Sequence, residues 1–157
     1  MDGARNVFPA ASTNLGGWGV PLERRSTMRV LVVDDAASVR QRLLARFRKA
    51  AGIEEVAEAA TGEEALERLE SFKPDLMTLD LMLPGMSGLE VLQETRKRDS
   101  EVKIVVFTNY PYPAFRRRCL ALGADQFFGK STDVERVLEL MEEDGASGNG
   151  ATRESRS

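Results

Sequence analysis

Five polar side chains of the kind that can carry phosphoryl chemistry stand at the ends of short apolar segments. They are Asp34, Asp35, Asp80, Thr108 and Lys130. Three carboxylates gathered in one crevice would repel one another unless a cation neutralised them, and hard oxygen ligands suit Mg²⁺. With the Lys130 ammonium and the Thr108 hydroxyl nearby, such a site could accept a phosphoryl group on one carboxylate and stabilise its oxygens.

The segments that must position these residues alternate between two hydrophobic patterns. Short apolar runs predict strands at 29–33, 55–60, 75–81, 103–108 and 125–130. Apolar residues at helical spacing predict helices at 38–50, 61–72 (opened by a capping box at Thr61–Glu64), 89–98 and 113–122, and a last helix capped by Thr132 or Asp133. This alternation requires right-handed crossovers and a parallel sheet covered on both faces. The sequence therefore predicts a doubly wound α/β domain whose ligand site lies at the carboxyl ends of the strands.

Two terminal segments follow neither pattern. Residues 1–27 and 145–157 are rich in Gly, Ser and other polar residues, which predicts a flexible N-terminal arm and a flexible C-terminal tail. The folded domain is then expected at 28–144. Trp18 is the natural anchor if the arm binds a partner.

The composition excludes several functions. The chain has 157 residues and no histidine, so it cannot carry a histidine-based triad or histidine-ligated zinc or haem. Its one cysteine, Cys119, cannot form a disulfide within the chain, which fits a reducing compartment. A net charge of −3 disfavours nucleic-acid binding by a general positive field, and no apolar stretch has the length of a membrane span. We expect a cytoplasmic protein without membrane contact.

Together these residues resemble the signature of response-regulator receiver domains, the phosphoacceptors of two-component signalling. The resemblance covers about residues 28–144. It is carried by Asp34-Asp35, by Asp80 within Leu79-Asp-Leu-Met-Leu-Pro-Gly-Met-Ser-Gly88, by Thr108 and by Lys130-Ser131. The match is specific because all five polar positions occur in order at the expected strand ends. It implies a flavodoxin-like α/β fold, a doubly wound five-stranded parallel sheet in the order 2-1-3-4-5 with five helices.

The resemblance also implies roles for individual residues. Asp80 would be the phosphorylated aspartate, assisted in catalysis by Thr108 and Lys130. The implied Mg²⁺ ligands are Asp35, Asp80 and the main-chain carbonyl of Met82, with Asp34 acting through water. Thr108 and Phe127 would form the conformational switch. Since consecutive strand residues point to opposite faces, Phe127 and Phe128 cannot both lie on the same side of the sheet.

The implied function is that of a single-domain response regulator, which changes its partner binding once Asp80 is phosphorylated. Because the chain has no histidine, a sensor histidine kinase or a phosphotransfer protein must supply the phosphoryl group. No enzyme activity is expected beyond Mg²⁺-dependent self-phosphotransfer and slow autodephosphorylation. No DNA-binding domain is expected after Lys130, where the sequence has room for one helix and a tail. The basic run Arg116–Arg118 offers a surface for an unknown target protein or for a phosphorylation-dependent homodimer.

Two departures from the common pattern of the family lie close to the expected site. Ser131 follows Lys130, where many members have a proline in a cis peptide, so the geometry of this loop is open. Met82 and Tyr110 stand at the positions that commonly tune the lifetime of the phosphoryl group, and neither is acidic. We expect them to shield the phosphoryl group from water and so prolong its lifetime, unless Tyr110 points outward.

Other interpretations use the same residues. A phosphatase of the haloacid dehalogenase type needs a second aspartate two residues after Asp80, where Met82 stands. A flavodoxin would bind a cofactor phosphate after the first strand, where Asp34 and Asp35 would repel it. Singly, the acidic pair could cap a helix and Lys130 could be a surface lysine. The alternative that stays open is a receiver-like protein-interaction module that acts without phosphorylation, because a fold does not determine a function.

Overall fold

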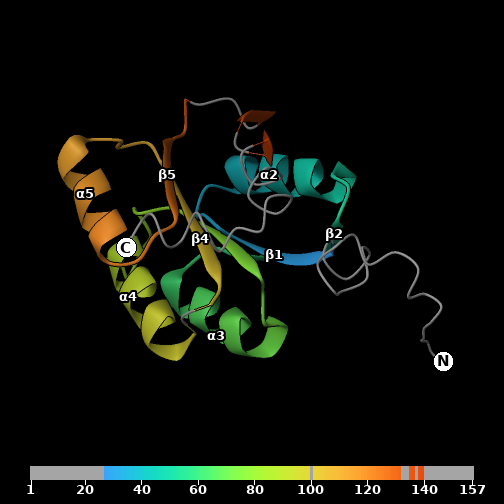
Figure 1. Ribbon diagram of the computed structural model, residues 1–157, viewed down its shortest axis with the longest axis horizontal. Helices are drawn as coiled ribbons and strands as arrows, with labels where there is room; N and C mark the ends of the chain where they lie inside the picture. Colours follow the sequence, from blue (N-terminus) through green and yellow to red (C-terminus); the bar gives the residue numbers. More distant parts are fainter. Residues whose placement is uncertain (1–26, 100, 132–134, 137, 140–157) are drawn as a thin grey trace, which may run out of the picture.

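One five-stranded parallel sheet, in the order β2-β1-β3-β4-β5, forms the centre of the molecule (Figure 1). The computed structural model describes residues 27–99, 101–131, 135–136 and 138–139. The strands are β1 (Met28–Val33), β2 (Ile53–Ala59), β3 (Leu76–Leu79), β4 (Lys103–Thr108) and β5 (Gln126–Gly129). The helices between them are α2 (Ala37–Lys49), α3 (Gly62–Phe72), α4 (Gly88–Arg98) and α5 (Pro113–Ala121). The predicted fold class and strand order are confirmed.

The last predicted helix lies only partly within the described residues. Residues 135–136 and 138–139 are helical, and the side chain of Leu138 is buried against the sheet. The predicted cap at Thr132 or Asp133 lies outside the described residues. So do residues 1–26 of the predicted arm and the whole of the predicted tail.

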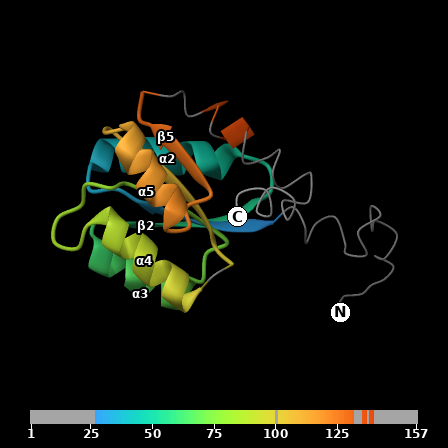
Figure 2. The same ribbon diagram turned by 60° about the vertical axis from the view of Figure 1, so that its left-hand side comes forward.

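The sheet separates two apolar layers, because successive side chains of a strand point to opposite faces. Leu31 and Val33 of β1 belong to the layer formed with α3, α4 and α5. Val30 and Val32 belong to the layer formed with α2 and Leu138. Figures 1 and 2 show α3 and α4 on one side of the sheet and α2 on the other. Within the described residues, no helix is long and apolar enough to cross a membrane.

Side-chain caps determine where two of the helices begin. At the start of α3, the Thr61 hydroxyl accepts the N–H of Glu64 at 3.1 Å, but the Glu64 carboxylate bonds the N–H of Ala60 at 2.7 Å. The predicted capping box is therefore only half formed, since its return bond is made one residue early. A complete capping box lies instead at Ser87 and Glu90, where it opens α4.

The third strand is shorter than the predicted range 75–81, because the chain leaves the sheet at Asp80. The N–H of Asp80 still bonds the carbonyl of Val33 at 3.0 Å, but the carbonyl of Leu81 accepts the N–H of Gly88 at 2.9 Å. Gly88 packs so closely that a Cβ there would lie 2.3 Å from the carbonyl oxygen of Asp80. A glycine is thus needed for α4 to begin directly behind this aspartate.

Candidate functional site

The first two acidic residues occupy the turn Asp34–Ala36 between β1 and α2, here called the acidic turn. The N–H of Asp34 bonds the carbonyl of Ala59 at 3.1 Å, which continues the β1–β2 pairing by one residue. The Asp34 side chain is 2% exposed, and its Oδ1 accepts the N–H of Ala36 at 2.9 Å. The next residue, Asp35, lies beyond the end of β1 and is exposed. One carboxylate is therefore held inside while its neighbour faces solvent.

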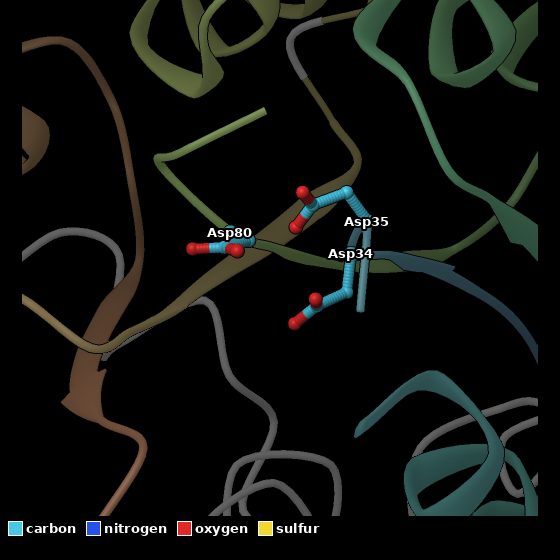
Figure 3. Close-up of side chains that lie close together, drawn as sticks. All are labelled: Asp34, Asp35 and Asp80. Carbon is cyan, nitrogen blue, oxygen red and sulfur yellow. The ribbon is translucent and has the colours of Figure 1, made fainter. Parts of the chain in front are cut away.

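Asp80 supplies the third carboxylate from the end of β3, and its residue is only 4% exposed. Its Oδ1 accepts the N–H of Met82 at 3.3 Å, a long hydrogen bond. Its Oδ2 accepts a hydrogen bond from Lys130 Nζ at 3.1 Å. Figure 3 shows the carboxylates of Asp34, Asp35 and Asp80 gathered around a common space. One oxygen from each lies within 4.8 Å of the others.

Lys130 bridges the two buried carboxylates of this acidic cluster (Asp34, Asp35 and Asp80). Its ammonium lies 2.7 Å from Asp34 Oδ2 and 3.1 Å from Asp80 Oδ2, and its side chain is buried. Burial alone would lower the pKa of Lys130, but the two carboxylates outweigh burial and raise it. The ammonium is therefore charged at neutral pH and stays between Asp34 and Asp80.

Negative charge is nonetheless in excess at the site. Burial is the main cause that raises the pKa of the Asp80 carboxyl, and the Asp34 carboxylate raises it further. Lys130 and the N–H of Met82 oppose this shift without cancelling it. Three carboxylates face one ammonium, so a divalent cation would balance the cluster.

The donor set fits Mg²⁺. Oxygen ligands about 2.1 Å from an octahedral Mg²⁺ lie about 3–4 Å from one another, and the 4.8 Å limit on the carboxylate oxygens is close to this range. Asp35 is exposed, so water and a cation can reach it. Three of the residues expected from the sequence lie close enough together to hold the ion, namely Asp34, Asp35 and Asp80, and the role of the Met82 carbonyl stays a prediction.

The predicted switch residues lie on β4 and β5, and Thr108 stands at the end of β4 next to Lys130. Thr108 is fully buried, and its hydroxyl oxygen accepts the N–H of Tyr110 at 3.1 Å. The carbonyl of Thr108 accepts the N–H of Lys130 at 2.7 Å, which ties the two strand ends together. Phe127 is buried in the layer of α3, α4 and α5, whereas Phe128 packs against the opposite layer. The two phenylalanines therefore face opposite sides of the sheet, as expected.

The loop after Thr108 is built around Pro111. The N–H of Tyr112 bonds the carbonyl of Tyr110 at 2.8 Å, which closes a tight turn on the proline. Pro111 rests on Gly129, where a Cβ would lie 3.0 Å from the proline Cγ. Tyr110 is 40% exposed and Met82 is 54% exposed, so both side chains reach solvent beside the cluster.

Two further features complete the site. The described residues contain no cis peptide bond, so the bond between Lys130 and Ser131 is trans.

Arg40, which the sequence analysis does not single out, donates a hydrogen bond to the carbonyl of Asp34 at 2.8 Å. Only its position one turn into the helix after an acidic pair could have pointed to it.

The sequence is similar to those of known proteins over most of the described residues. The family model described as the response regulator receiver domain matches residues 30–142. The chain belongs to this family. As a receiver domain it is similar to the chemotaxis protein CheY of Thermotoga maritima, with 37% identity over 113 residues that cover 72% of this chain and 93% of that protein.

Solved receiver domains have the same fold. A two-component response regulator of the LuxR family from Aurantimonas has a TM-score of 0.71 and 31% identity, covering 77% of this chain and 86% of that one. The CheX-CheY-BeF3-Mg²⁺ complex from Borrelia burgdorferi contains a chain with a TM-score of 0.66 and 27% identity, covering 78% of this chain and 87% of that one. The chain is thus a receiver domain of two-component signalling, like these regulators.

Proposed function

We propose that this receiver domain accepts a phosphoryl group on Asp80 and uses it to change its binding to a partner protein. The observation that carries the proposal is the acidic cluster, with three carboxylate oxygens within 4.8 Å of one another and Lys130 between Asp34 and Asp80. The donor is a histidine kinase or a phosphotransfer protein, because the chain has no histidine of its own. The protein acts as a regulator, and its only catalysis is self-phosphotransfer and slow loss of the phosphoryl group.

The transfer is a displacement at phosphorus. A carboxylate oxygen of Asp80 forms the new O–P bond while the P–N bond to the donor's imidazole breaks, and its electron pair stays on that nitrogen. Lys130 is placed to pair with the oxygens of the phosphoryl group, because its Nζ already contacts Asp80 Oδ2. As Lys130 turns toward the phosphoryl group, Asp34 loses part of this pairing.

Asp35, Asp80 and the carbonyl of Met82 are the proposed direct ligands of Mg²⁺, with Asp34 acting through water. When bound, the ion would neutralise charge on the transferred phosphoryl oxygens. Of the three carboxylates, Asp35 is the most accessible to a metal ion, because it is exposed whereas Asp34 and Asp80 are buried and paired with Lys130. Replacing Asp35 by alanine should therefore abolish Mg²⁺ binding while the fold is kept.

Thr108 is the proposed sensor of the phosphoryl group. Its hydroxyl oxygen accepts the N–H of Tyr110, and turning toward a phosphoryl oxygen would break this bond and free the loop that carries Tyr110. Phe127 would then move into the space that Thr108 leaves. The exposed arginines Arg116–Arg118 on α5 lie next to this region, and Arg116 bonds the carbonyl of Phe127 at 3.2 Å. We propose that this surface meets the target or a second copy.

The decisive experiment is phosphorylation by a small donor. The protein is incubated with acetyl phosphate or phosphoramidate, with and without Mg²⁺, and its intact mass is measured. We expect one acid-labile phosphoryl group that requires Mg²⁺, its loss in Asp80→Asn, and its retention in the control Asp75→Asn at the opposite edge of the sheet. Phosphate retained in Asp80→Asn would refute the assignment, and no phosphorylation of the wild type would favour the interaction module.

The switch has its own readout. Beryllofluoride with Mg²⁺ imitates the aspartyl phosphate, so its addition should shift the amide NMR signals of residues 108–130. Signals that stay unchanged there, in a sample that binds beryllofluoride, would contradict the proposed role of Thr108 and Phe127.

A further inference from the structure

Arg40 of α2 forms hydrogen bonds to the acidic turn. Its Nη1 donates to the carbonyl of Asp34 at 2.8 Å, and its main-chain N–H donates to the carbonyl of Ala36 at 3.0 Å. Its Nε forms a 2.7 Å ion pair with Glu58 of β2, and the Arg40 side chain is only 16% exposed. The main-chain bond is the ordinary first-turn bond of α2, so the contacts specific to the arginine side chain are those to the Asp34 carbonyl and to Glu58 of the edge strand β2.

The acidic turn has few other supports. Ala36, at the N-terminal cap of α2, makes no side-chain capping bond. The remaining contacts are the N–H of Asp34 to Ala59 and the N–H of Ala36 to Asp34 Oδ1. The second of these uses the carboxylate that also pairs with Lys130. When the charges of the cluster rearrange, the bonds from Arg40 to the Asp34 carbonyl and from the Asp34 N–H to Ala59 still support the turn, because neither uses a carboxylate of the cluster.

A second arginine, Arg29, makes contacts of the same kinds near the other end of β1. Arg29 donates from Nε and Nη2 to the carbonyl of Phe72, at 2.9 Å and 2.6 Å, and forms an ion pair with Glu55 of β2. Both arginines join a main-chain carbonyl to a glutamate of the same strand. They differ in place, since only Arg40 touches the turn that carries Asp34 and Asp35.

We infer that Arg40 is a positioning residue of the phosphoacceptor site. By holding the carbonyl of Asp34, the Arg40 side chain sets the direction in which Asp35 is presented beside Asp80 to a divalent cation. Glu58 holds the guanidinium in place, so the ion pair with β2 is part of the same device. This inference rests on the proposed function for its metal, and on the geometry of the turn alone for its structural part.

The test compares Arg40→Ala with the matched control Arg29→Ala. In isothermal titration calorimetry with Mg²⁺ alone, Arg40→Ala should weaken Mg²⁺ binding about tenfold, as is usual when a residue that orients a metal ligand is lost. Arg29→Ala should bind Mg²⁺ like the wild type, although both variants lose an ion pair and some stability. Arg40→Lys, which can reach the Asp34 carbonyl or Glu58 but not both, should bind with intermediate affinity.

A second measurement needs no metal. In the metal-free protein, amide hydrogen exchange at Ala36 should be faster by about tenfold in Arg40→Ala and unchanged in Arg29→Ala, because exchange follows local opening of the turn. If Arg40→Ala does not fold, Glu58→Gln takes its place, with a smaller effect of the same sign on exchange.

The two proposals can fail separately. Equal Mg²⁺ affinity and equal Ala36 exchange in the Arg40 and Arg29 variants would overturn the inference, even if Asp80 is phosphorylated. A wild type that takes no phosphoryl group from acetyl phosphate would overturn the proposed function. In that case faster Ala36 exchange in Arg40→Ala alone would still support the positioning role.

Discussion

The aspartates where the strands begin and those where the strands end differ in how their charges are compensated. Asp75 and Asp125 precede β3 and β5, at the edge where the strands begin. Asp75 accepts the N–H of Arg29 at 2.9 Å, and Asp125 accepts the N–H of Ile104 at 2.9 Å while pairing with Arg96 at 3.0 Å. Each of these carboxylates serves to start a neighbouring strand.

At the edge where the strands end, carboxylates outnumber their partners. Asp34 and Asp80 share one ammonium, and Asp35 beside them is exposed. Burial first, and the Asp34 carboxylate in addition, raise the pKa of Asp80 despite the adjacent Lys130. The difference teaches that an aspartate beside a strand is not in itself a functional sign. A cluster of aspartates whose charges are not compensated does indicate a functional site, because their repulsion does not stabilise the fold.

The largest effect on stability is expected where the strands begin, at the ion pair between Asp125 and Arg96. Asp125→Ala should lower the free energy of unfolding by about 3 kcal/mol, because it removes a buried carboxylate that pairs with Arg96 and accepts the N–H of Ile104. Urea denaturation measures this loss. The control Glu94→Ala, which removes exposed ion pairs of α4, should cost less than about 1 kcal/mol. Equal losses in the two variants would contradict the contrast between the edges.

A gain in stability is expected at the acidic cluster, where the strands end. Asp80→Asn should raise the free energy of unfolding of the metal-free protein, because burial and the Asp34 carboxylate disfavour the charged form of Asp80. Asp34 keeps its ion pair with Lys130. Urea denaturation in a chelator measures the gain, and saturating Mg²⁺ should reverse it. A loss of stability in the chelator would mean that attraction to Lys130 outweighs the repulsion.

The pH dependence of stability should show the same imbalance. The folded-state pKa of Asp80 lies above its ordinary value of 3.8, so between these two values the native state binds more protons than the unfolded state. The contribution of Asp80 to stability is then full below pH 3.8 and is lost as pH rises through the folded-state pKa. Comparing metal-free wild type with Asp80→Asn across this range isolates the effect. Parallel curves for the two proteins would disprove it.

The smallest effect concerns the lifetime of the phosphoryl group. Met82→Asn and Tyr110→Glu should each speed dephosphorylation a few-fold, because amide and carboxylate groups can orient an attacking water where a thioether and a phenol ring obstruct it. The exposure of both side chains limits the effect. The measurement is the Mg²⁺-dependent decay of phosphorylated protein after the donor is removed. Unchanged decay in both variants would show that these side chains do not shield the site.

Much of the fold follows from local sequence patterns. The apolar run before Asp34 reads as a buried strand because its side chains fill both faces of the sheet. The order of polar residues at successive strand ends predicted a common site, since parallel strands end at the same edge. The capping box of α4 also follows a sequence pattern, with Ser87 three residues before Glu90, although the sequence analysis predicts no cap there.

Other features were decided only by the tertiary structure. Lys130 reaches Asp34 as well as Asp80, and Arg40 binds the Asp34 carbonyl together with Glu58, because packing brings distant segments together. The early end of β3 depends on how closely Gly88 approaches Asp80. A sequence pattern states which face a side chain occupies, through the period of its own helix or strand. Which partner it meets, and how buried the pair becomes, depends on how the elements are stacked.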